Sequence, residues 1–389
     1  MKIPGLIRGV LILCVAVTPI SQVLSARLLF AAFVISIFAL RKISDFREIL
    51  HNGWDFLLRI LLILIGYTYT DDVTTAFKVL ETNFSFLAIP FILYGSRMYH
   101  KSDVYRIFYA FILGVATASF MCLIYAIANY FETRDSSVFF YYKFVDVINS
   151  HPTYFAYYQI TAITFILYLF YFEDLPKGRV FAWNVVLILL FGTFTLTGGR
   201  TASISLLFVL SFFLLKFLLD KKSAKRIVAA VSVALMMCGL FVVGFLEIEM
   251  PEISVHDYWE RSVLWKSAIL ANPDKIFGVG TGDYKEVLNG YYNSHGMAAF
   301  AEDSYNAHNQ FIHQYLTGGL LGLIGLTILL SRPLYVSVRR QDALGTMVLF
   351  PFILYGITEV FLGRYQGVIF FALFHQLFIS FKYEKELGV

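Results

Sequence analysis

The stretch Asn306-Ala-His308-Asn309-Gln-Phe-Ile-His-Gln-Tyr-Leu-Thr-Gly-Gly319-Leu-Leu-Gly322 lies where the one long polar segment of the chain passes into an apolar run. That run continues to about residue 331, which is long enough to cross a bilayer as a helix. The stretch therefore puts a histidine, a candidate proton acceptor, at the mouth of a membrane helix. This position indicates chemistry at a membrane surface rather than simple anchoring.

The composition indicates a membrane protein. Of the 389 residues, 58% are hydrophobic and 15% are charged. A soluble protein of this length cannot bury so much apolar surface, so we expect a polytopic membrane protein. The net charge of +4 is small and gives no indication of nucleic-acid binding. Cys14, Cys122 and Cys238 fall in three different apolar runs, which favours packing residues over a disulfide framework or a metal site.

The apolar runs predict an all-α fold with about twelve transmembrane helices in a single integral membrane domain, residues 1–389. Basic residues gather in the segments that a cytoplasmic N-terminus places inside, as the positive-inside rule expects. The expected spans lie near residues 5–24, 26–40, 55–69, 83–96, 105–130, 153–172, 180–197, 202–219, 227–248, 310–331, 342–362 and 366–381.

Two of the outer segments are long enough to do more than turn. One covers about 131–152, and the other is a large extracytoplasmic loop over 249–309. Apolar residues recur with helical periodicity over Trp259–Leu270, so we expect the large loop to be folded. Within it, the glycine-rich Phe277–Asp283 lacks the spacing of a nucleotide-binding loop and is predicted to be a turn.

Arginines on the predicted outer side are the second functional signal. Arg200, Arg261, Arg364 and, more weakly, Arg134 lie there against the positive-inside bias. Any one of them alone is equally well explained as an interfacial arginine that snorkels to lipid phosphates. Together they favour an anion site near His308, because a guanidinium binds phosphate through two parallel hydrogen bonds. The natural anionic ligand at this surface is a diphosphate on a lipid carrier.

Histidine is the residue type best suited to act as a general base on a hydroxyl near neutral pH, which makes His308 the candidate base. Asn309 is expected either to orient a sugar hydroxyl or to cap the helix that follows. Gly319 and Gly322 allow another helix or a lipid tail to approach closely. His313 lies about 140° further around the helix and is predicted to face elsewhere.

Three further residues are candidates for substrate binding. Asp303, just before His308, is placed to hold its imidazole or to bind a sugar. His151 and Tyr154 open the span near 153 on the same outer side, where helix capping and an interfacial aromatic belt explain them equally well. No motif typical of a metal-dependent mechanism is present, and we expect neither a metal nor another cofactor.

The spacing of His308-Asn309, nine residues and then Gly319-x-x-Gly322 resembles the signature of the O-antigen ligase and O-antigen polymerase superfamily. The predicted span number, the large late loop and an arginine in Thr197-Gly-Gly-Arg200-Thr agree with this resemblance. The layout covers most of the chain, whereas the specific motifs cover a small part of it.

The resemblance implies a metal-independent, inverting glycosyltransferase that is similar to the GT-C class. Ligases of this family transfer a glycan from undecaprenyl diphosphate to the lipid A–core of lipopolysaccharide. Carried onto this chain, the family's histidine corresponds to His308, acting as general base, and its two arginines to Arg261 and Arg200. Arg364 matches no family motif and is included on topology. The expected location is the bacterial inner membrane, where lipids surround the spans. The active site and loop 249–309 are expected to face the periplasm.

Several alternatives share these features. A polymerase would use the same donor with a lipid-linked acceptor, and a protein glycan ligase would use a pilin-type acceptor. A lipid-linked glycan transporter would need ionisable residues in the middle of its spans. Arg59 and Lys216 are the main basic residues within predicted spans, so the charge pattern favours surface chemistry over transport. A purely structural role leaves the outward arginines unexplained.

Overall fold

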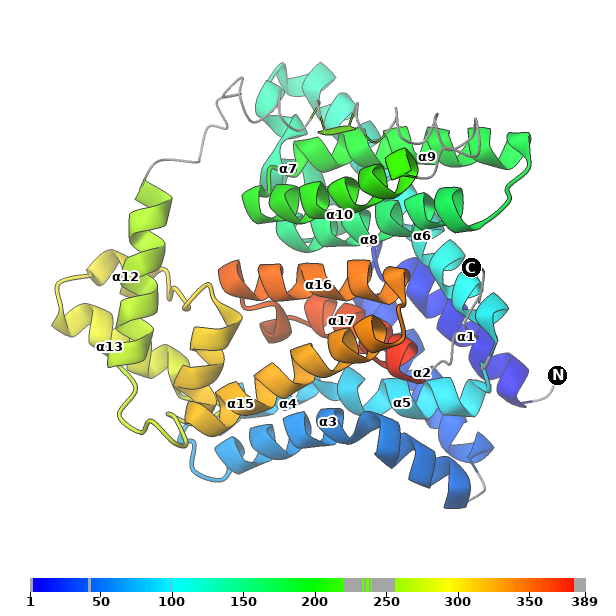
Figure 1. The fold of residues 1–389 in the computed structure, drawn as a ribbon. Coiled ribbons are helices and arrows are strands. Elements are labelled where there is room, and N and C mark those ends of the chain that lie inside the picture. Colours follow the sequence, from blue (N-terminus) through cyan, green and yellow to red (C-terminus); the bar gives the residue numbers. More distant parts are fainter. Residues whose placement is uncertain are drawn as a thin grey trace. The chain divides into compact units, whose positions relative to one another are not determined.

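The computed structural model describes residues 3–40, 43–98, 100–219, 233, 236–237, 239 and 256–380. Every regular element in these ranges is a helix (Figure 1). The elements are α1 (Ile3–Val17), α2 (Gln22–Ala39), α3 (Ile43–Tyr67), α4 (Val73–Thr82), α5 (Phe84–Ser96), α6 (Lys101–Thr133), η1 (Ser136–Phe139), α7 (Tyr141–Val145), η2 (Asp146–Ile148), α8 (Pro152–Phe172), α9 (Lys177–Leu196), α10 (Arg200–Leu219), α12 (His256–Leu270), α13 (Tyr284–Ser294), α14 (Ala298–Glu302), α15 (Gln310–Arg339), α16 (Ala343–Thr358), η3 (Phe361–Gly363) and α17 (Tyr365–Ser380).

The prediction of an all-α polytopic membrane protein is confirmed. Within the described ranges, eight helical segments are long and apolar enough to cross a membrane, and α1, α16 and α17 are shorter apolar helices. Each predicted span has a helical counterpart among these, except the span at 227–248, most of which lies outside the described residues.

Large apolar side chains point outward from several of these helices. On α9, Phe181 is 73% exposed and Ile188 is 70% exposed, and Leu113 and Phe131 of α6 are each 65% exposed. Such surfaces are unfavourable in water and favourable against lipid tails, because lipid is as apolar as the side chains themselves. The exposed residues therefore support the membrane assignment independently of helix length.

Helical structure extends into two segments that the sequence predicted to be loops. α3 begins at Ile43 rather than near residue 55, and Gly53 (φ −110°, ψ 15°) separates its first part from the span. Phe46 and Leu50, one turn apart, give this first part an apolar edge, which stabilises a helix at an interface. α4 is a further helix, capped where the carboxylate of Asp72 accepts from the Thr75 amide at 2.9 Å.

The described chain divides into two compact units. The first contains residues 1–11, 29–101 and 254–389, and the second contains 12–28 and 102–253. The assignment of 1–389 to a single membrane domain stays a prediction. In the first unit, α15 packs against α3, α16 and α17. The helices α12, α13 and α14 gather near the N-terminal end of α15 (Figure 1).

A buried ionic network joins three helices of the first unit. The carboxylate of Asp55 accepts hydrogen bonds from Arg332 and from His375, the latter at 2.8 Å. The predicted span 310–331 ends just before Arg332 and so leaves it in the inner segment that follows, but α15 continues to Arg339, so Arg332 lies within the helix. An unpaired carboxylate would be very unfavourable inside the protein, so the buried Asp55 must keep both partners. These contacts hold α3, α15 and α17 together.

α15 is interrupted at Gly319, whose φ of 58° and ψ of −154° are not helical. In an unbroken helix, the Leu320 amide would donate to the Leu316 carbonyl. Instead, the Leu320 amide donates to the carbonyl of Lys275 at 2.8 Å. The Leu316 carbonyl accepts from the amide of Val279 at 2.9 Å. A segment of the large loop is therefore inserted into the hydrogen-bond ladder of α15.

The next amide–carbonyl pair of α15, Leu321 and Thr317, is separated in the same way. The Leu321 amide donates to the Ile276 carbonyl at 3.3 Å, and the Thr317 carbonyl accepts from Gly280 at 3.2 Å. We call residues 275–280 the inserted segment. We expected another helix or a lipid tail to approach Gly319 and Gly322, and this expectation is wrong. The inserted segment packs against Gly319, and Gln314 of α15 itself packs against Gly322.

The inserted segment continues into contacts with the end of α3. The Thr281 hydroxyl donates to the Ile63 carbonyl at 2.8 Å. The Asp283 carboxylate accepts from the Thr70 hydroxyl at 2.7 Å and from the Asp72 amide at 2.8 Å. Burial alone would raise the pKa of Asp283, but these hydrogen bonds outweigh it and hold the pKa below its ordinary value. The predicted turn at Phe277–Asp283 is thus confirmed, and it ties the loop to both α3 and α15.

The large loop has its own hydrophobic core, as the helical periodicity of Trp259–Leu270 predicted. Buried side chains from α12, α13 and the start of α15 pack together in one cluster. The members of this loop core are Leu264, Ala268, Val279, Leu288, Tyr292, Ala307 and Leu316. Because Ala307 and Leu316 belong to the cluster, the loop core extends to both sides of His308–Gln310, where α15 begins.

Gly319→Ala is predicted to destabilise the protein by about 2 kcal/mol or more, since a Cβ there adds left-handed strain and meets the loop backbone. That Cβ would lie 2.2 Å from the carbonyl oxygen of Ile276. Thermal unfolding in detergent, followed by fluorescence-detected gel filtration, measures the effect.

The control variant is Gly290→Ala in α13, where an added Cβ meets nothing within 4 Å. It is expected to keep or slightly raise the unfolding temperature, because alanine favours a helix by about 0.5–1 kcal/mol over glycine. Equal unfolding temperatures for the wild type and Gly319→Ala would show that the inserted segment is not packed against α15 as described.

Candidate active site

The backbone at His308 is held in an unusual conformation. Its φ is 40°, which lies in a region of backbone conformation that residues other than glycine rarely adopt. The amide of His308 donates to the Asn306 side-chain oxygen at 2.7 Å, and the neighbours Ala307 and Asn309 are buried. Such a conformation costs about 1–3 kcal/mol and persists where the surrounding structure enforces it, which is typical of functional sites.

Asn309 begins α15. Its side-chain oxygen accepts from the amides of Phe311 at 2.9 Å and Ile312 at 3.0 Å. The predicted capping role is therefore confirmed, whereas a contact between Asn309 and a sugar hydroxyl stays a prediction. The next residue, Gln310, accepts from the Leu362 amide at 2.8 Å, so the start of α15 is also bound to η3.

Glu359 is the carboxylate that faces His308. Its Oε2 lies 3.6 Å from His308 Nδ1, with side-chain exposures of 17% for Glu359 and 30% for His308. This distance is too long for a good hydrogen bond but close enough for an ion pair when the imidazole is protonated. His308 is thus open enough to meet a substrate and has an anion beside it.

Sequence reasoning missed Glu359. The apolar run of 342–362 was predicted to be one span, which placed Glu359 inside it, but α16 ends at Thr358 and Glu359 is its C-cap residue. The available signal was the charge itself, since a lone carboxylate near the outer end of an apolar run requires a partner or a function.

Arg261 and Arg364 are the outward arginines of the first unit. Arg261 is half-buried on α12, and Arg364 is exposed directly after η3. Within the described ranges, neither guanidinium has a hydrogen-bond or ion-pair partner. α12 packs against α15, and η3 is bound to Gln310, so both arginines belong to elements that contact the helix beginning beside His308. Their charges are available for an anionic ligand.

Arg200, His151 and Tyr154 belong to the second unit. Arg200 is exposed at the first residue of α10, after Gly198 with a φ of 66°. His151 caps α8: its Nδ1 accepts from the Thr153 amide at 3.3 Å, which confirms the capping interpretation. Tyr154 is buried, with its ring centroid 5.7 Å from that of His151. The assembly of these residues with His308 stays a prediction.

Asp303 and His313 lie on either side of His308 in sequence. Asp303 is exposed, and its carboxylate makes no ion pair in the described part of the chain, so its predicted sugar contact remains a prediction. The ring centroid of His313 lies 4.7 Å from that of Tyr284, and its orientation away from His308 stays a prediction. Among the described residues, no three His, Cys, Asp or Glu side chains gather in a group suited to a metal ion.

Comparison with known proteins agrees with the resemblance seen in the sequence. Residues 185–327 match the family model described as O-antigen ligase, which supports the resemblance to the O-antigen ligase and polymerase superfamily. The matched region contains Arg200, Arg261 and His308 and ends before Glu359 and Arg364.

A relative from Haemophilus influenzae (strain ATCC 51907 / DSM 11121 / KW20 / Rd), described as an uncharacterized protein, is 25% identical over 230 residues. The alignment covers 52% of this chain and 57% of the relative, so the chain matches little more than half of that protein's length.

Asn309→Ala is predicted to lower stability by about 0.5–2 kcal/mol, because two amides at the start of α15 lose their acceptor. Asn309→Asp retains the acceptor oxygen and is expected to unfold close to the wild-type temperature. Thermal unfolding of the two purified variants measures this difference. An Asn309→Ala protein as stable as Asn309→Asp would contradict the capping role.

Proposed function

We propose that this chain, which matches the O-antigen ligase family model over residues 185–327, transfers a glycan from undecaprenyl diphosphate to the lipid A–core of lipopolysaccharide. It would do so at the periplasmic face of the bacterial inner membrane, by an inverting and metal-independent mechanism. The observation that carries this proposal is the pairing of His308 with Glu359 beside elements that bear unpaired arginines.

His308 is the proposed general base. It takes the proton from an acceptor sugar hydroxyl as that oxygen attacks the anomeric carbon of the donor. The bond between this carbon and the diphosphate oxygen breaks on the opposite face, so the configuration inverts. The proton remains on the imidazole, and Glu359, 3.6 Å from Nδ1, stabilises the resulting positive charge.

The arginines act on the leaving group in this proposal. Negative charge builds on undecaprenyl diphosphate as the glycosidic bond breaks, and cationic groups placed where charge develops lower the barrier. Arg261 is the first candidate, because it is half-buried and has no partner among the described residues. Arg364 is available in the same unit, and Arg200 remains a candidate on the family resemblance alone.

An O-antigen or exopolysaccharide polymerase is the second candidate function. It would use the same donor and the same base, with a lipid-linked glycan as acceptor. The description of the matched family favours the ligase, and so does the single large late loop with its own core.

The buried charged groups favour a glycosyltransferase over a transporter. Asp55 is paired with Arg332 and His375, and Arg59 is hydrogen-bonded to Gln314 and to Asn83. These groups thus have partners within the protein, as expected of groups that hold helices together. A coupling ion or a substrate would need such groups to be available.

His308→Ala is predicted to reduce transfer about 10²–10⁴-fold, the usual loss when a well-placed general base is removed. A strain lacking the gene is complemented with wild type, His308→Ala or, as a control, His295→Ala, and its lipopolysaccharide is resolved on gels. His295 belongs to the same loop but is exposed and stacked on Tyr291. We expect wild type and His295→Ala to restore the ladder and His308→Ala to leave glycan on the lipid carrier.

The gel separates the candidate functions. Core bearing one repeat unit, with all longer chains missing, would identify a polymerase. An unchanged ladder in the strain lacking the gene would contradict both functions for that glycan. Full restoration by His308→Ala would remove the histidine from the mechanism.

A further inference from the structure

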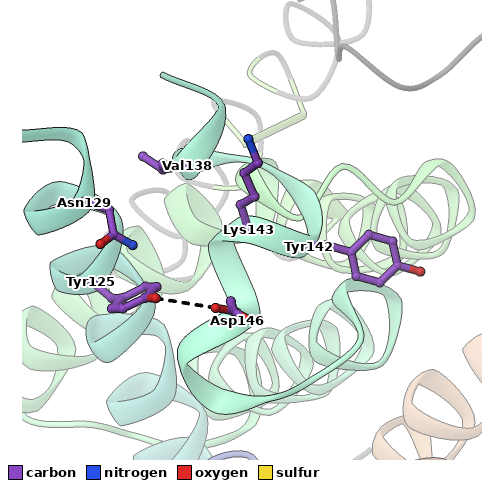
Figure 2. Close-up of a pocket in the computed structure, with 6 residues that line it drawn as sticks. All are labelled: Tyr125, Asn129, Val138, Tyr142, Lys143 and Asp146. Carbon is purple, nitrogen blue, oxygen red and sulfur yellow. Dashed lines mark hydrogen bonds between the residues drawn. The ribbon is translucent and has the colours of Figure 1, made fainter. Parts of the chain in front are cut away.

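A pocket of about 340 Å³ opens in the second unit, between the end of α6 and the short helices that follow it. Figure 2 shows its lining. Tyr125 and Asn129 lie one turn apart on α6, Val138 comes from η1, Tyr142 and Lys143 come from α7, and Asp146 begins η2. η1, α7 and η2 lie in the predicted outer segment 131–152, and Tyr125 and Asn129 lie at the end of the predicted span 105–130 that leads into it. The site described above makes no use of this pocket.

The wall of the pocket is held by local interactions. Asp135 caps η1 by accepting from the Ser137 amide at 2.9 Å. The ammonium group of Lys143 donates to the Asp135 carboxylate at 3.1 Å and to the Ser137 hydroxyl at 2.6 Å. Val138 of η1 and Phe144 of α7 are buried. The pocket is therefore a formed feature of the segment.

Polar groups in the pocket have capacity for a ligand. Within the described ranges, the side-chain amide of Asn129 makes no hydrogen bond. The Asp146 carboxylate accepts from the Tyr125 hydroxyl at 3.4 Å, which is long and leaves most of its acceptor capacity open. Figure 2 shows Tyr125 and Asp146 facing each other, with Asn129 above Tyr125. The hydroxyl of Tyr142 points away from them and is bonded to His151 Nε2 at 2.7 Å.

The charges in the pocket favour a neutral ligand. Lys143 is already paired with Asp135, so its charge is largely compensated, and Asp146 would repel an anion such as a lipid phosphate. An amide, a carboxylate and a phenol within one small cavity instead suit a ligand with several hydroxyl groups. The ring of Tyr125 and the side chain of Val138 add apolar surface for the C–H face of a sugar ring.

We propose that this pocket binds a saccharide unit, with Asp146 and Asn129 as the principal contacts. The inference rests on the proposed function, because the pocket lies in a segment predicted to share the outer side with His308. The saccharide has two possible sources, the glycan of the lipid-linked donor and the core oligosaccharide of the acceptor.

The test is binding of two water-soluble probes to the full-length His308→Ala protein in detergent. One probe is the glycan released by mild acid from the lipid-linked pool of the host, and the other is delipidated core oligosaccharide. Saturation-transfer NMR titrations give the dissociation constant. Asp146→Asn and Asn129→Ala, each added to His308→Ala, are expected to weaken the binding of one probe about tenfold or more.

Glu132→Gln is the matched control, because it also converts a carboxylate into an amide, on an exposed residue of α6 that does not line the pocket. It is expected to bind as the parent protein does. Tyr125→Phe, which removes one hydroxyl group, gives an independent variant if Asp146→Asn does not fold. Gel filtration reports folding in each case.

The outcomes separate this inference from the proposed function. Unchanged binding in all the pocket variants, or no binding of either probe, overturns the pocket as a sugar site. Competition by glycerol phosphate with equal affinity also overturns it in favour of a phosphate site. If the wild type transfers no glycan while the pocket variants still lose sugar binding, the proposed function fails and the pocket assignment stands.

Discussion

The interruption of α15 at Gly319 is the constraint on which the rest of the first unit depends. Two consecutive helical hydrogen bonds are replaced by four bonds to the inserted segment 275–280, so no amide or carbonyl of these pairs is left without a partner. Irregular backbone is tolerated at membrane depth only where protein buries it. The large loop therefore does more than connect helices, because it completes one of them.

This insertion explains how a flexible connection becomes a site of fixed geometry. The loop core includes Ala307 and Leu316, the inserted segment anchors Gly319, and Asn309 caps the helix between them. His308 lies between Ala307 of the loop core and the helix cap Asn309, and its backbone is held at a φ of 40°. A general base must keep its position to within a fraction of an ångström, and strong local constraint is one way to achieve that.

The sequence predicted the features that depend on local pattern. Apolar runs located the helices, the periodicity of Trp259–Leu270 predicted a folded loop, and Asn309 was recognised as a candidate cap. Features that depend on distant partners were missed. Nothing near Gly319 indicates that its partner lies at 275–280, and Glu359 was hidden by an apolar run whose end is set by tertiary contacts. Arg332 was assigned to a loop because its buried partner, Asp55, is far away in sequence.

The pairing of His308 with Glu359 is the central claim, and a double-mutant cycle tests it most directly. Transfer rates are measured for purified wild type, His308→Ala, Glu359→Gln and the double variant, with a lipid-linked donor and a lipid A–core acceptor. If Glu359 acts through the imidazole, Glu359→Gln slows the wild type but costs little more once His308 is absent. Equal fold-losses in both backgrounds, or a Glu359→Gln protein as fast as the wild type, would contradict the account.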